Sequence, residues 1–304
     1  MIRAVSSGRQ LSRTPSSAVE NVWSTVQNDE MPRVSFQDVA QAFDHVDDPD
    51  VIEKAKTNPA LWYALEISRP RNWRGTGIQP DRFLAVATES GIPVAWVPPA
   101  SVLKELASAT PTDRMAIVHA HASDILTQCG DLLSECSDEW LGDARLLVRR
   151  AIQAFHAGHH EAAMALAVIV GEPLALWASV PHVQMFESEA EKQSWAKMRG
   201  SKKYDLAKIE LAAVGPRRKL DRAEVLRHAL IAPIPRFFRP FHASPGKEND
   251  TLSRHATVHG PSVNHLTTDN ALLAIMLCIS ILREQQAWCE EVRDEEAFAE
   301  QFDS

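Results

Sequence analysis

Residues 271–282, A-L-L-A-I-M-L-C-I-S-I-L, are almost entirely apolar, and the predicted fold is built around them. A helix at a protein surface is apolar on one face, whereas a helix that is apolar all round lies inside a core or a membrane. These 12 residues are fewer than the roughly 20 that cross a bilayer. The sequence therefore predicts a helix over residues 268–284 that runs through the middle of a helical bundle, with no membrane association.

The sequence before this stretch also repeats apolar residues at helical spacing. Gly158 and the Thr-Pro-Thr-Asp sequence at residues 110–113 separate the patterns, because glycine and proline break helices. The patterns predict helices over residues 114–136, 141–155, 159–179, 187–198, 205–214 and 222–230. The fold class that we predict is therefore mainly α.

Three regions follow from these patterns. Residues 112–304 form the bundle, residues 36–110 form a smaller mixed region that is partly irregular, and residues 1–35 form a flexible arm. Within the mixed region, the apolar residues 92–97 lie between a glycine and two prolines. That pattern suits one buried strand. Since a lone strand cannot make a sheet, an extended loop is the alternative.

The composition is that of a globular protein. The chain has 304 residues, 45% of them hydrophobic, with 32 Lys and Arg against 40 Asp and Glu and a formal net charge of -8. This balance excludes a wholly disordered chain and a uniformly basic nucleic-acid coat protein. The negative charge is concentrated in residues 284–304, which hold eight acidic residues and one basic residue.

Four cysteines are few for this length, and none form a C-x-x-C pair. Cys278 lies within the apolar stretch, where a thiol behaves as a small hydrophobic group. This usage is typical of a reducing compartment, so we predict a cytoplasmic protein.

A basic segment lies at residues 214–242. A local basic segment can bind phosphates even on an acidic protein, because the field that a ligand meets is local. A solvated helix face or loop is the alternative. Its seven bases are Arg217, Arg218, Lys219, Arg222, Arg227, Arg236 and Arg239.

The candidate for chemistry is S-R-H-A-T-V-H-G-P-S-V-N-H, residues 253–265, which lies between the basic segment and the apolar helix. Imidazole moves protons near neutral pH, and the guanidinium group of arginine offers a fork of donors to phosphate. The Gly260-Pro261 pair stops a helix. We therefore expect Arg254, His255 and His259 at a chain break on the rim of the bundle.

Residues 254–259, R-H-A-T-V-H, resemble the R-x4-H motif of the HEPN superfamily, whose second position is commonly Asn, Asp or His. The resemblance covers this hexapeptide and the helical pattern of roughly residues 112–304. It implies an HEPN-like bundle and a metal-independent endoribonuclease that needs no cofactor and acts as a homodimer. Such proteins serve in bacterial or phage toxin and antiphage defence systems, where an antitoxin or regulatory protein is a further partner.

The resemblance also implies roles for individual residues. Arg254 would bind and polarise the scissile phosphate of RNA, and His259 would be the general acid and base for attack by the ribose 2′-hydroxyl. His255 would orient or support the reaction. The residues that would lead RNA to the cleft are Arg217, Arg218, Lys219, Arg236 and Arg239.

Helix geometry limits how Arg254 and His259 can meet. Positions five apart lie about 140° around an ideal helix. The two side chains therefore converge only if Gly260 unwinds the helix end or if a second protomer supplies one of them. His255 and His259, four positions apart, face the same way.

Several alternatives stay open. His255, His259 and His265 have the H-x3-H-x5-H spacing of metzincin zinc sites, but Ala256 stands where that motif has its glutamate base. Arg254 could instead pair with a carboxylate while both histidines cap helix ends. The protein would then be a non-catalytic helical scaffold or regulator that binds protein or nucleic acid.

Two further groups of residues are weaker candidates for a functional site. The histidines at 119 and 121 lie on opposite sides of a helix, and those at 156, 159 and 160 surround a glycine. Residues 69–74 combine three arginines with Trp73, a combination found in proteins that bind single-stranded nucleic acid. An ordinary surface loop is the alternative.

Overall fold

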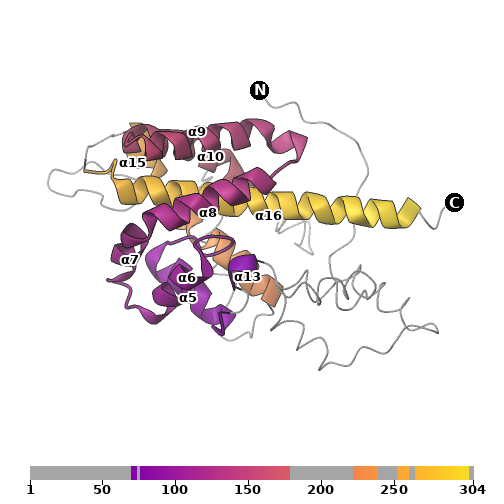
Figure 1. Ribbon diagram of the computed structural model, residues 1–304, viewed down its shortest axis with the longest axis horizontal. Coiled ribbons are helices and arrows are strands. Elements are labelled where there is room, and N and C mark those ends of the chain that lie inside the picture. Colours follow the sequence, from indigo (N-terminus) through magenta and orange to yellow (C-terminus); the bar gives the residue numbers. More distant parts are fainter. Residues whose placement is uncertain (1–69, 74–75, 179–221, 239–251, 260–263, 301–304) are drawn as a thin grey trace, which may run out of the picture.

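The computed structural model describes residues 70–73, 76–178, 222–238, 252–259 and 264–300. The described residues contain helices and no strand, which confirms a mainly α protein built as a helical bundle (Figure 1). The flexible arm predicted for residues 1–35 lies outside the described residues, as do residues 36–69 of the mixed region and the helices predicted at 187–198 and 205–214.

The longest helix, α16 (Thr268–Glu300), is the central element that the apolar stretch predicts. Every residue from 271 to 282 is buried. The helix also continues through the first part of the acidic segment, beyond the predicted end at residue 284. Glutamate, alanine and arginine are good helix formers, so the polar extension stays helical after the core ends.

Three helices pack around α16: α8 (Ala122–Glu135), α9 (Gly142–His156) and α10 (His160–Ala178). Helix α8 runs in the same direction as α16, because His119 before it contacts Asp269, and Ser137 after it contacts Gln286. Helix α9 runs the opposite way, since Trp140 before it contacts Cys289, and α10 turns back beside α9 (Figure 1). This four-helix arrangement is the main core of the protein.

A second layer lies under α8 and α16 in Figure 1. It contains α5 (Pro80–Ser90), α6 (Ala100–Ser108) and α13 (Arg222–Ile231), with α13 packed against α5. Short elements complete the described chain. They are two 3-10 helices, Arg71–Trp73 and Glu139–Leu141, and the helices α7 (Arg114–Ala120), α14 (Ile234–Phe237) and α15 (Arg254–His259).

The single helix predicted for residues 114–136 is wrong, because the chain breaks between α7 and α8 at His121. The imidazole of His121 lies 3.2 Å from Glu105 and 3.6 Å from Asp124. The Glu105 contact comes from α6, whereas Asp124 is only three residues further along, in α8. No glycine or proline lies at this break. The predicted break at Gly158 is confirmed, with a left-handed φ of 80°.

Residues 92–97 form a buried loop, so of the two predictions for this stretch the extended loop is the correct one. Side chains supply the hydrogen bonds that a neighbouring strand would have supplied. Asn72 Nδ2 donates to the carbonyls of Val94 and Pro98, each at 2.9 Å, and Trp73 Nε1 donates to Val94 at 2.8 Å. Trp73 is only 3% exposed, so it cannot stack on a nucleic-acid base.

All four cysteines are buried and unpaired in the structure. Burial raises the pKa of the Cys278 thiol to about 12, and its sulfur donates to the carbonyl of Ala167 on α10 at 3.1 Å. Burial also raises the pKa of Cys136 to about 11. These thiols stay protonated at neutral pH, so they are packing groups rather than nucleophiles.

One segment, Thr268–Glu290 of α16, is long and apolar enough to cross a membrane among the described residues. However, 83% of its most apolar window is buried inside the protein. The central helix of a folded bundle has these same properties.

The left-handed residue that ends α5 is Gly91, with a φ of 69°. Its N–H donates to the carbonyl of Ala87 at 2.9 Å, which closes the last turn of the helix. The side chain of Arg236 lies where a Cβ atom at this position would stand. Gly91 therefore satisfies both a backbone conformation and a close contact.

We expect Gly91→Ala to lower the free energy of unfolding by more than the roughly 1–2 kcal/mol that a left-handed alanine costs, because Arg236 must also move. Gly158→Ala is the matched control, since Gly158 has a φ of 80° and no atom near its Cβ position. Urea unfolding of both variants measures the difference. Equal losses would show that the Arg236 contact contributes nothing.

Candidate functional site

The short helix α15 carries the R-x4-H residues and packs against α10. Ser253 precedes it, and its hydroxyl accepts a hydrogen bond from the N–H of Ala256 at 3.3 Å. This is the geometry of an N-cap, which satisfies a backbone donor that the first turn leaves open. Ser253 and Ala256 are buried, so the helix is anchored on its inner side.

Arg254 forms an ion pair with Glu172 of α10. Its Nη2 and Nε atoms lie 3.0 and 3.1 Å from the same oxygen, Oε2 of Glu172. The side chain of Arg254 is 15% exposed and that of Glu172 is 30% exposed. The pair joins α15 to α10 near the surface, and it is the carboxylate contact that we named as the alternative to phosphate binding.

Sequence reasoning did not single out Glu172, although a signal was present. Residues 162–178 contain no other charged side chain. A charged group in an apolar helix is costly unless it is paired, so a lone glutamate there predicts a cationic partner.

Arg254 and His259 converge within one chain. The Nη1 atom of Arg254 lies 3.4 Å from Nε2 of His259. The long arginine side chain reaches along the helix to its last residue, and no second protomer is needed to bring the two groups together. Because Nε and Nη2 are directed at Glu172, the guanidinium group presents its remaining nitrogen to the imidazole.

His255 and His259 share one side of α15, as their spacing predicts. Their ring centres are 5.7 Å apart with an angle of 35° between the planes. Burial, then the positive charges of Arg254 and His259, lower the pKa of His255, while Glu172 partly opposes this shift. His255 is therefore neutral at neutral pH.

This shift in the pKa of His255 gives a pH prediction. A histidine whose pKa is lower in the folded protein takes up its proton first in the unfolded chain. Its contribution to stability is present above the ordinary pKa of 6.5 and is lost as the pH falls below that value. We expect Glu172→Gln to lower the pKa of His255 further and Arg254→Gln to raise it. NMR titration of the histidine ring protons measures both changes, and shifts in the opposite directions would contradict the assignment.

His265 does not join the other two histidines in a zinc-type site. It is 2% exposed, and its Nε2 atom lies 3.1 Å from both the Thr257 hydroxyl and the Ser253 carbonyl. Those contacts tie the chain after α15 to the start of the helix. Among the described residues, no group of three or more His, Cys, Asp or Glu side chains is placed to hold a metal ion.

In the described part of the chain, none of the basic residues predicted to guide RNA to the cleft is found beside α15. Arg217, Arg218, Lys219 and Arg239 lie outside the described residues. Arg236 lies at the end of α5, where its Nη2 donates to the carbonyl of Glu89. It therefore packs on the second layer of the protein, and no described contact joins it to Arg254.

The other histidines that we considered make separate contacts. His119 lies 2.7 Å from Asp269 at the start of α16, while His121 contacts Glu105 and Asp124. The ring of His160 stands edge-on to Phe155 at 4.6 Å. None of these contacts forms a second histidine site among the described residues.

Comparison with known proteins finds no match: no family model fits the chain, and neither a curated protein nor a solved structure matches it.

Proposed function

We propose that the protein is a metal-independent endoribonuclease of the HEPN type, acting in a cytoplasmic toxin or antiphage defence system. The observation that carries the proposal is the 3.4 Å approach of Arg254 Nη1 to His259 Nε2 at the partly exposed end of α15. A cationic donor beside an imidazole is the pair that phosphoryl chemistry on RNA requires. The homodimer and the antitoxin or regulatory partner belong to the same proposal.

The reaction follows from these groups. His259 takes the proton of a ribose 2′-hydroxyl as the oxygen attacks the neighbouring phosphorus. The bond from phosphorus to the 5′-oxygen then breaks, and that oxygen receives a proton from a general acid. The products are a 2′,3′-cyclic phosphate and a 5′-hydroxyl, so no water or redox partner is consumed.

Arg254 would stabilise the negative charge that builds up on the phosphate oxygens during this attack. Glu172 holds the guanidinium group through Nε and Nη2, which keeps Nη1 directed at His259. Neutral His255 lies on the same side of the helix and can support proton transfer without adding positive charge. The basic residues outside the described chain would bind flanking phosphates.

The experiment is cleavage of a single-stranded RNA by the purified protein, in EDTA and with a matched substrate carrying one 2′-deoxyribose at the cleavage position. We expect cleavage in EDTA, 2′,3′-cyclic phosphate ends, and no cleavage at the deoxy position. Cleavage of the deoxy substrate, or products with 3′-hydroxyl ends, would contradict the mechanism.

One observation favours a second function. The Arg254–Glu172 ion pair at 3.0 Å also suits a purely structural link between α15 and α10. The protein would then be a non-catalytic helical scaffold or regulator that binds protein or nucleic acid. In that case no RNA in a broad panel is cleaved, and substituting either partner changes stability alone.

A further inference from the structure

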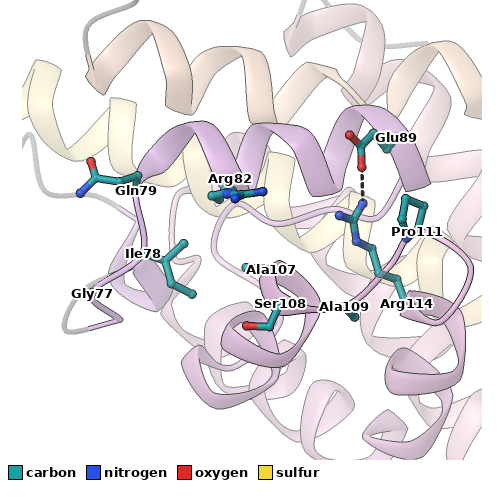
Figure 2. A pocket seen from close by; sticks show the side chains of 10 residues that line it. All are labelled: Gly77, Ile78, Gln79, Arg82, Glu89, Ala107, Ser108, Ala109, Pro111 and Arg114. Carbon is teal, nitrogen blue, oxygen red and sulfur yellow. Dashed lines mark hydrogen bonds and ion pairs between the residues drawn. The ribbon is translucent and has the colours of Figure 1, made fainter.

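A pocket of about 640 Å³ opens between α5 and the end of α6, away from α15. Its volume lies within the range of small-molecule sites, which is roughly 300–1,000 Å³. Figure 2 shows Arg82 and Glu89 on the α5 side of the pocket, with Ala107 and Ser108 of α6 on the other. Arg114, the first residue of α7, completes the wall.

Arg114 is held rigidly in this wall. Its Nη1 atom donates to Glu89 Oε2 at 2.9 Å and to the Ser90 hydroxyl at 3.0 Å, and its Nε donates to the Leu106 carbonyl at 3.2 Å. The residue is only 5% exposed. A guanidinium group fixed in this way loses little conformational entropy when it binds a ligand.

The remaining nitrogen of Arg114 is available to a ligand. Its Nη2 atom makes no hydrogen bond to the described residues. It is also not fully buried, because it is absent from the set of enclosed polar atoms that lack a partner. It is therefore reachable from the pocket. Since Arg114 lines the pocket, a bound anion could receive charge-assisted hydrogen bonds from this nitrogen.

Arg82 adds a second cation. Its side chain is exposed and has no ion pair in the described part of the chain. The charged lining consists of two guanidinium groups and one carboxylate, and the Glu89 carboxylate is already bound by Arg114. The pocket is therefore positively charged, which favours an anionic ligand.

The other lining residues narrow the ligand class. Ile78, Ala107 and Pro111 are apolar, and no aromatic side chain lines the pocket. A nucleobase would have no ring to stack on, whereas a short aliphatic group would fit against these residues.

We propose that this pocket binds a small aliphatic anion, a carboxylate or a phosphate, whose charged group lies between Arg82 and Arg114. The site is separate from α15 and does not depend on the ribonuclease proposal.

The test is calorimetric titration of the full-length protein with butyrate and with inorganic phosphate, each at constant ionic strength in chloride. We expect at least one probe to bind with a Kd of about 1 mM or tighter. Binding of butyrate alone identifies a carboxylate ligand, and binding of phosphate alone identifies a phosphoryl ligand. Arg82→Gln should weaken binding about tenfold or more.

Lys104→Gln is the matched control, because Lys104 is an exposed cation of α6 that does not line the pocket. Its affinity should equal that of the wild type. The Arg82 variant avoids the folding role of buried Arg114, so the test does not depend on a variant that fails to fold. Absence of binding of both probes, or equal affinity of Arg82→Gln and wild type, would overturn the proposal.

Discussion

Arg254→Ala and His259→Ala should each reduce RNA cleavage by about 10²–10⁴-fold, the range for removing one acid–base group or one donor to the reacting phosphate. The two side chains meet at 3.4 Å, so under the proposed function they would act on the same phosphate. The double variant should therefore lose little more than the worse single variant, because groups that act as a unit are not additive. Single-turnover cleavage of a labelled RNA measures these rates.

The matched control is His156→Ala, which removes an exposed histidine at the end of α9 outside the site. It should cleave RNA at the wild-type rate. Arg254→Lys separates charge from geometry, because lysine keeps the charge but not the planar fork. Circular dichroism must show that Arg254→Ala stays folded, since this change also removes the Glu172 ion pair. Wild-type rates in both folded alanine variants would eliminate the catalytic proposal.

Trp96→Ala should lower the free energy of unfolding by about 3–5 kcal/mol, the usual cost of deleting a large aromatic side chain from a core. Trp96 is 2% exposed, and its Nε1 donates to Glu284 of α16 at 2.8 Å. The guanidinium group of Arg283 lies 4.7 Å from the centre of its ring. This side chain therefore joins the buried loop at residues 92–97 to the central helix.

Trp96→Phe is the control for the Trp96 prediction. It keeps an aromatic ring but removes the hydrogen bond to Glu284, so it should cost about 1–3 kcal/mol. Urea unfolding of both variants gives the comparison. If Trp96→Ala costs no more than Trp96→Phe, the ring contributes little and the account of this joint is wrong.

Much of the bundle could be predicted from local patterns. The apolar residues 271–282 need burial on every side, and α16 is buried there. Helices α9, α10 and α13 agree with the predicted ranges to within a residue or two, and Gly158 separates α9 from α10. These features were predictable because helical periodicity and glycine conformation are properties of short stretches of chain.

Other features depend on contacts between distant residues. No glycine or proline marks the helix break at His121, and one of the partners of its imidazole, Glu105, lies 16 residues away in α6. The Val94 carbonyl in the loop at 92–97 accepts hydrogen bonds from Asn72 and Trp73, which lie 22 and 21 residues away in the sequence. Periodicity within a segment carries no information about such partners.

The candidate site divides in the same way. The sequence predicted that Arg254, His255 and His259 lie beside a helix stop and that the two histidines face the same side, whereas the structure showed that all three belong to one short helix, α15. The sequence also predicted that Arg254 and His259 would diverge unless the helix end unwound or a second copy helped. The structure brings them together through the length and direction of the arginine side chain, which Glu172 holds.

Local sequence patterns were enough to predict a bundle of helices around one apolar helix, with an arginine and two histidines beside a helix stop before it. Only the packed helices show that Glu172 pairs with Arg254, that Arg236 caps α5, and that Arg82 and Arg114 share a pocket. The reason is physical. Burial of apolar surface depends on composition and period, whereas ion pairs and pockets depend on which distant side chains the packed helices bring within a few ångströms.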